Sequence, residues 1–223
     1  MTDAPPRYDG LAQWYEQFRP ALSDDELAAL GRLLGPGTGR CLDLGCGTGL
    51  PTEAVARLGW SALGVDPSSD LLEVARARGV EVLQAPAEAL PFEDASFDAV
   101  VSVWTHTDID DFPAAVAEAA RVLKPGGPFV YIGGHPCFVG PHSLFVGAEG
   151  APEFHPGYRR TGRYDGSAPG VGDPEGLRVR VGGVHLTLHD FFAAFTTAGF
   201  AVERFEELGE RDYPHVVALQ ARR

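Results

Sequence analysis

The chain has 223 residues, 44% of them hydrophobic, and a net charge of −13, enough for one sizeable core. Because a phosphate backbone is bound by clustered lysines and arginines, this acidic balance excludes a nucleic-acid-binding surface. Three cysteines give no disulfide framework, and no leader or apolar run of membrane length is visible. We therefore expect a cytoplasmic protein with no membrane partner.

Residues 1–39 are expected to form an N-terminal helical cap. Ser23 followed three residues later by Glu26 is a capping box, which predicts a helix that continues to Leu34. The glycines and the proline of residues 35–39 then end it.

From residue 40 onward, short apolar runs alternate with amphipathic stretches, a pattern typical of a parallel sheet covered by helices on both faces. The expected strands are 40–44, 61–65, 80–84, 99–103, 129–133, 201–206 and 216–220, and the expected helices lie near 51–58, 69–78, 111–122 and 187–198. Residues 134–185 break this rhythm, with many glycines and prolines and four histidines. We interpret them as an irregular insertion that covers the substrate within a single domain.

A glycine-rich loop follows the first expected strand. Gly45, Gly47 and Gly49 let the backbone take φ > 0 and let a ligand approach closely, and the following helix would point its N-terminus at that ligand. A dinucleotide loop reads G-x-G-x-x-G, but Leu50 occupies the third glycine position. The loop alone predicts a nucleotide-like cofactor without deciding which one.

Acidic residues and two further motifs surround this loop. Asp43 lies on the strand, two residues before the loop, where it could accept from a cationic amino group. Asp66 ends the second strand and could accept from both hydroxyls of a ribose. The run LPF at 90–92 precedes the fourth strand, and LKPGG at 123–127 precedes the fifth.

Taken in this order, these blocks resemble the class I S-adenosylmethionine-dependent methyltransferases of the small, methyltransferase-11-like type. The resemblance implies a Rossmann-like α/β fold, with a seven-stranded, mostly parallel sheet, an antiparallel last strand and helices on both faces. The methyltransferase core would comprise residues 40–133 and, more loosely, 186–223. The implied cofactor is S-adenosyl-L-methionine, lying over the ends of the first, second and fourth strands.

The resemblance also implies cofactor contacts. Asp43 matches the acid nearest the methionine amino group, and Asp66 matches the ribose-binding acid. The expected cofactor-binding residues are Asp43, Gly45, Cys46, Gly47, Gly49, Asp66, Pro67, Ala87, Glu88 and Trp104. The chain departs from the family at Pro86, where relatives often carry an aspartate beside the adenine. Since proline offers neither a carboxylate nor an N–H, the adenine contact would pass to Ala87 or Glu88.

Histidines follow the strands that end nearest the expected methyl group. His106 comes after the fourth strand and His135 after the fifth, and ligands bind at the carboxyl ends of parallel strands. Because an imidazole titrates near neutral pH, we predict that one of the two is a general base. His185 and His189 have the i, i+4 spacing of a helical zinc motif but lack its glutamate, so no metal is predicted.

We therefore predict methyl transfer to a small-molecule acceptor, foremost a hydroxyl of an aromatic or secondary metabolite. The substrate-binding residues expected near the insertion and the N-terminal helix are Tyr8, Trp14, Tyr15, His142 and His185. The alternatives are N- or C-methylation (including a quinone-type carbon), an NAD-dependent oxidoreductase, and a non-catalytic adenosylmethionine-binding protein. The chain is expected to be a monomer or a homodimer. Its basic cluster, Arg159, Arg160 and Arg163, is interpreted as a solvated face.

Overall fold

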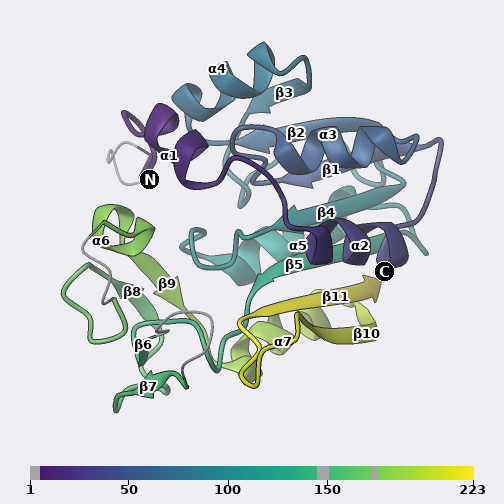
Figure 1. The fold of residues 1–223 in the computed structure, drawn as a ribbon. Helices are drawn as coiled ribbons and strands as arrows, with labels where there is room; N and C mark the ends of the chain where they lie inside the picture. The colour runs from purple at the N-terminus through teal and green to yellow at the C-terminus, as the bar shows by residue number, and fades with distance from the viewer. Residues whose placement is uncertain (1–5, 145–150, 172–174) are drawn as a thin grey trace.

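A seven-stranded sheet forms the centre of the fold in the computed structural model, which describes residues 6–144, 151–171 and 175–223 (Figure 1). The strands lie in the order β10-β11-β5-β4-β1-β2-β3. Their bounds are Arg40–Leu44 (β1), Ser61–Asp66 (β2), Glu81–Gln84 (β3), Ala99–Val103 (β4), Pro128–Gly134 (β5), Ala201–Leu208 (β10) and Val216–Arg222 (β11).

Strand direction within this sheet agrees with the prediction. The last strand, β11, pairs antiparallel with both β5 and β10, and the other neighbours pair in parallel. The α/β fold with a reversed last strand is therefore confirmed. The predicted strands 40–44 and 99–103 match residue for residue, whereas β10 and β11 each run two residues further than predicted. They are longer because the backbones of β10 and β11 are hydrogen-bonded to each other. The pattern of apolar residues does not reveal such pairing.

Helices cover both faces of the sheet. Their bounds are Ala12–Phe18 (α1), Asp24–Leu33 (α2), Leu50–Arg57 (α3), Ser69–Ala77 (α4), Phe112–Val122 (α5), Leu177–Val181 (α6) and Leu188–Thr197 (α7). In Figure 1, α2 and α3 lie in front of the sheet and α5 and α7 lie behind it. Side chains of each strand alternate between the two faces: on β4, Val101 packs with α2 and α3, whereas Val100 packs with α5 and α7.

The predicted capping box is present at the start of α2. The Ser23 hydroxyl accepts from the backbone N–H of Glu26, and the Glu26 carboxylate accepts from the N–H of Ser23 at 2.8 Å. Glu26 also accepts from the indole Nε1 of Trp104 and from Arg19. This buried carboxylate therefore fixes the N-terminal cap against the end of β4.

The predicted insertion contains small paired strands. β6 (Ser143–Leu144) pairs with β7 (Glu153–Phe154), and β8 (Gly162–Tyr164) pairs with β9 (Gly183–His185). Residues 145–150 and 172–174 of the predicted insertion lie outside the described residues. Arg178 in α6 donates to Asp108 at 2.6 Å and to the hydroxyl of Thr107 at 2.7 Å. The insertion is thereby held against the connection that follows β4.

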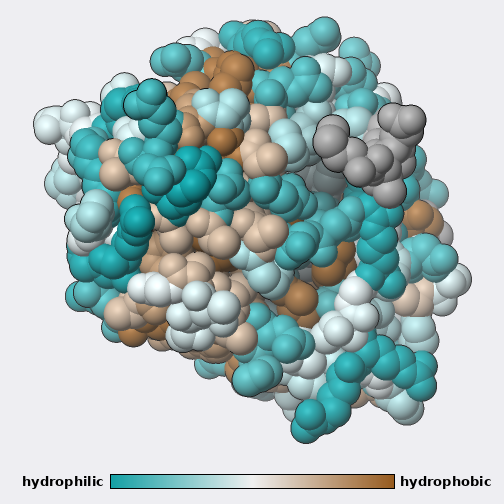
Figure 2. Space-filling model, turned by 180° about the vertical axis from the view of Figure 1, so that it is seen from behind, coloured by the Kyte–Doolittle hydropathy of each residue, from teal (hydrophilic) through white to brown (hydrophobic). Residues whose placement is uncertain are grey.

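Hydrophilic residues dominate the upper and right-hand parts of the rear face, and a more apolar area lies left of centre (Figure 2). Among the helices of the described ranges, none combines the length and the apolar character needed to cross a membrane. The cytoplasmic location stays a prediction.

Candidate functional site

A cavity of about 280 Å³ lies at the carboxyl ends of β1, β2 and β4. Gly45 and Gly47 after β1, Asp66 and Pro67 after β2, and Trp104 after β4 all line it. Because β1 lies between β4 and β2, the chain leaves β1 and β4 toward opposite sides and opens a crevice between them. Open α/β sheets bind their ligands at such a point.

The glycine loop has the left-handed conformation that its sequence suggests. The φ angle is +76° at Gly45 and +85° at Gly49, which caps the start of α3. A Cβ atom at Gly45 would lie 2.5 Å from Cγ2 of Thr105, so a side chain there would collide with the loop after β4. The backbone N–H of Gly47 donates to Oδ2 of Asp66 at 3.0 Å, which joins the loop to the end of β2.

Asp66 presents a buried carboxylate to the cavity. Its oxygens accept from the backbone N–H groups of Gly47 and of Ser68, the latter at 2.9 Å. Burial raises the pKa of Asp66 to about 6, and these two hydrogen bonds oppose that rise. The carboxylate is thus largely ionised at neutral pH, and each oxygen has lone-pair capacity left for a ligand hydroxyl.

Asp43 lies beneath the loop and is fully buried. Its Oδ2 accepts from the hydroxyl of Thr52 at 2.6 Å, whereas its Oδ1 has no hydrogen-bond partner. Burial raises the pKa of Asp43 to about 7. A buried acceptor without a partner is costly, and a cationic ligand group would both satisfy it and favour its ionised form.

The wall between β3 and β4 includes Pro86, Ala87 and Glu88. Cys46 instead lines a small neighbouring cavity of about 30 Å³, which it shares with Tyr15 and other residues of the loop and the N-terminal cap. Burial raises the pKa of the Cys46 thiol, so this cysteine stays protonated and packs as a small side chain.

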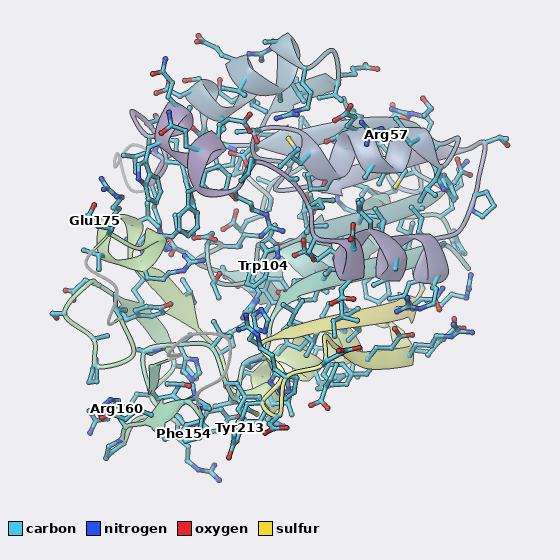
Figure 3. The ribbon with its side chains drawn as sticks, viewed as in Figure 1. Arg57, Trp104, Phe154, Arg160, Glu175 and Tyr213 are labelled. Atoms are coloured by element: carbon cyan, nitrogen blue, oxygen red, sulfur yellow. The ribbon has the colours of Figure 1, made fainter. Side chains whose placement is uncertain are left out.

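Aromatic side chains of the N-terminal cap cover part of the cavity. Tyr8 and Tyr15 line it, with ring centroids 5.3 Å apart in an edge-to-face arrangement. Trp104 lies at the centre of Figure 3 and lines both cavities. Trp14 instead stacks on Phe18 outside the cavity lining. Burial raises the pKa of Tyr15 to about 12, so its phenol remains neutral.

The two histidines predicted as bases are both buried. The Nδ1 of His106 is hydrogen-bonded to the hydroxyl of Tyr131, and burial lowers its pKa to about 3. His135 has its Nε2 at 3.2 Å from Oε1 of Glu207, and burial lowers its pKa as well. Neither side chain lines the cavity.

His142 and His185 pack against each other inside the insertion. Their ring centroids are 4.7 Å apart, and the Nε2 atoms are hydrogen-bonded to the backbone carbonyls of Cys137 and Tyr158. Neither lines the cavity. Across the described ranges, no three His, Cys, Asp or Glu side chains converge as metal ligands.

A methyltransferase domain model matches residues 42–131, the segment that carries the loop, Asp66 and Trp104. Over 88% of this chain, the structure superimposes on 96% of an S-adenosylmethionine-dependent methyltransferase from Mesorhizobium loti, with a TM-score of 0.71 and 27% identity. Residues 42–131 therefore form a methyltransferase domain, and the fold is that of the class I S-adenosylmethionine-dependent methyltransferases.

Curated relatives match about half of this chain. A demethylmenaquinone methyltransferase of Tropheryma whipplei is 36% identical over 132 residues, 55% of each chain. A fatty-acid O-methyltransferase of Mycolicibacterium smegmatis is 39% identical over 103 residues, 44% of this chain and 38% of that one. The chain spans about half the length of the first of these relatives.

The site fits the family's cofactor, S-adenosylmethionine. Gly45 and Gly47 leave backbone exposed to the cavity, and Asp66 offers carboxylate oxygens to a ribose. The unpartnered Oδ1 of Asp43 fits a ligand ammonium group. Gly49 begins α3 and lies outside the cavity lining, so its role is to shape the loop.

Several residues that the sequence did not single out also line the cavity. They are Arg7, Thr105, Asp108, Ile109, Asp110 and Arg163. All three arginines of the basic cluster are exposed, as a solvated face requires (Arg160 is at the lower left of Figure 3), and Arg163 also lines the cavity. The Arg163 side chain is 64% exposed, and the pairing of β8 with β9 also brings it to Asp110. Only its basic character in the insertion was readable from the sequence.

Proposed function

We propose that this methyltransferase transfers the methyl group of S-adenosylmethionine to a small-molecule acceptor, foremost a hydroxyl of an aromatic or secondary metabolite. The observation that carries the proposal is a single cavity that is lined by Asp66 and the glycine loop and also by the aromatic rings of Tyr8, Tyr15 and Trp104. Flat aromatic walls suit an aromatic acceptor.

The bound cofactor supplies a methyl group on a positively charged sulfur, an electrophile that needs no further activation. The protein's task is to hold the acceptor in line and exclude water. Positioning of this kind can contribute about 7–11 kcal/mol. Tyr8 and Tyr15 line the cavity, and burial keeps their phenols neutral, so neither ring presents a phenolate that would compete with the acceptor.

A general base would assist a hydroxyl acceptor, and His135, although it does not line the cavity, is the stronger of the two candidates. Its hydrogen-bond partner Glu207 is about half exposed, whereas His106 is enclosed by Tyr131 and the rings of α5 and α7. His135→Gln should lower kcat by about 10²–10⁴-fold at neutral pH without changing affinity for S-adenosylhomocysteine. If His135→Gln turns over as fast as the wild type, His135 is not the base, and positioning of the acceptor is the protein's sole contribution to the rate.

C-methylation of a quinone-type carbon is the second candidate, favoured by the similarity to a demethylmenaquinone methyltransferase. Cofactor labelled with carbon-13 at the methyl group separates the outcomes, because methyl groups on oxygen, nitrogen and carbon differ in chemical shift. We would incubate the protein with catechol and with 1,4-naphthohydroquinone as probes.

Binding is tested first, by thermal shift with S-adenosylhomocysteine and, in parallel, NAD. A ligand at 100 times its dissociation constant adds about 2.7 kcal/mol of stability. Stabilisation by NAD alone would overturn the proposal. Stabilisation by S-adenosylhomocysteine without transfer to any acceptor would favour the non-catalytic binding protein.

A further inference from the structure

An N-terminal strap, residues 6–10, crosses the cofactor cavity. On one side, Asp9 accepts from the hydroxyl of Ser68 at 2.7 Å, and the backbone N–H of Gly10 donates to Asp70 at 2.6 Å. Both partners lie at the start of α4, next to the ribose-binding end of the cavity. On the other side, Arg7 forms an ion pair with Asp110 on the connection between β4 and α5. The strap is thus anchored on both walls of the cavity.

The insertion also binds Asp110, the residue that anchors Arg7 of the strap. Arg163 on β8 of the insertion donates to Asp110 through Nε at 2.7 Å and also through Nη2. Asp110 therefore holds two arginines that are 156 residues apart in the sequence. Hydrogen bonds from Arg163 and the charge of Arg7 lower the pKa of Asp110, so the carboxylate is ionised throughout the neutral range.

Arg7 also has a donor that no residue of the described chain satisfies. Its Nη2 binds Asp110, but its Nη1 is buried and has no hydrogen-bond partner. Arg7 lines the cavity. Buried donors without partners are rare in folded proteins, and each calls for an explanation. Oxygen or ring-nitrogen acceptors on a ligand in the cavity would satisfy this one.

We propose that Arg7, Asp110 and Arg163 form an ionic clasp that closes the strap over the bound cofactor, with Nη1 of Arg7 donating to that cofactor. The inference rests on the proposed function, since the ligand beneath the strap is S-adenosylmethionine or its product. Arg7 and Arg163 both lie outside residues 42–131, the part that matches the family model. The clasp is therefore a feature of this chain beyond the shared domain core.

If the clasp holds the strap closed, the bound cofactor should dissociate more slowly than from a variant without the clasp. The dissociation rate of S-adenosylhomocysteine measures this. Trp104 lines the cavity, so its fluorescence follows release of the ligand after rapid dilution. Asp110→Asn breaks both ion pairs and should raise the dissociation rate about 5- to 30-fold, as expected for the loss of two partly exposed pairs. Arg163→Gln leaves the Arg7 pair intact and should raise the rate about 2- to 5-fold.

Direct donation by Arg7 makes a separate prediction for equilibrium affinity. In calorimetric titration, Arg7→Gln should raise the dissociation constant more than Arg163→Gln does, because only the former removes a ligand donor. Equal effects of the two variants would overturn the direct contact. Asp94→Asn is the matched control, since Asp94 pairs with Arg121 on an exposed surface and lies outside the cavity lining.

The clasp itself is overturned if Asp110→Asn and Arg163→Gln both release the ligand within twofold of the control. A purely structural role would lower the melting temperature equally with and without ligand, and this also overturns it. Near-UV circular dichroism checks that Asp110→Asn is folded, and Arg163→Gln provides the test if it is not. If the wild-type chain binds no S-adenosylhomocysteine, the proposed function fails instead.

Discussion

Replacing Asp43 by asparagine should stabilise the ligand-free methyltransferase at alkaline pH. Burial raises the pKa of this carboxyl from 3.8 to about 7. The folded protein therefore keeps a proton that the unfolded chain releases. For this group, the free energy of unfolding is highest below about pH 4 and falls as the pH rises to 7. Because one pH unit corresponds to about 1.4 kcal/mol, the loss by pH 8 is about 4 kcal/mol.

Asparagine carries no charge at any pH and keeps an oxygen for the hydroxyl of Thr52, which Asp43 now accepts at 2.6 Å. Asp43→Asn should therefore exceed the wild type in unfolding free energy by about 2–4 kcal/mol at pH 8 and by less than about 1 kcal/mol at pH 4. Urea unfolding without ligand, at several pH values between these limits, measures the difference.

When ligand is present, the ionised form of Asp43 should stabilise the protein, whereas in the ligand-free protein it is destabilising. In the wild type, protonation of Asp43 below pH 7 would weaken S-adenosylhomocysteine binding about tenfold per pH unit. Asp43→Asn should bind this ligand more weakly than the wild type at pH 8, and its affinity should depend less on pH. Parallel stability curves for the two ligand-free proteins, or a less stable variant at pH 8, would refute the argument that burial of this charge is costly.

Two further substitutions test Asp66 and Gly45, which both line the cavity. Asp66→Asn should lower S-adenosylhomocysteine affinity about 10- to 100-fold, because ribose hydroxyls lose an anionic acceptor; a dissociation constant within threefold of wild type in calorimetry would contradict this. Gly45→Ala should lose about 2–4 kcal/mol of stability in urea, since its φ is +76° and its Cβ would meet a threonine methyl group at 2.5 Å. Gly79→Ala has a similar φ of +84° but open space, so it should lose only about 1–2 kcal/mol. Equal losses would show that the collision is unimportant.

The fold could be predicted from the sequence because burial imposes local periodicity. Strands 40–44 and 99–103 are buried on both faces in the centre of the sheet and read as continuous apolar runs. The ends of β10 and β11 were predicted less exactly, because these strands take their length from pairing with each other and not from apolar residues. The insertion 134–185 gave little periodic signal, because its strands have two or three residues and its contacts are long-range.

The cofactor end of the site was predictable for a related reason. Gly45, Gly47 and Asp66 are close in the sequence or follow consecutive strands, so their spacing reports their geometry, and all three line the cavity. The histidines show the limit of that approach. His106 and His135 do follow strand ends, but residue type and position along the chain do not determine which way a side chain turns. Both rings are hydrogen-bonded to residues outside the cavity lining, Tyr131 and Glu207.

The sequence by itself determined the order of elements, the resemblance to the methyltransferases and several residues that line the cavity, because each of these depends on neighbours along the chain. Tertiary structure alone decided what closes the cavity. Arg7, Asp110 and Arg163 meet although more than 50 residues separate each from the next. No local pattern marks them, since an ion pair between distant segments requires only that the folded backbone bring opposite charges together.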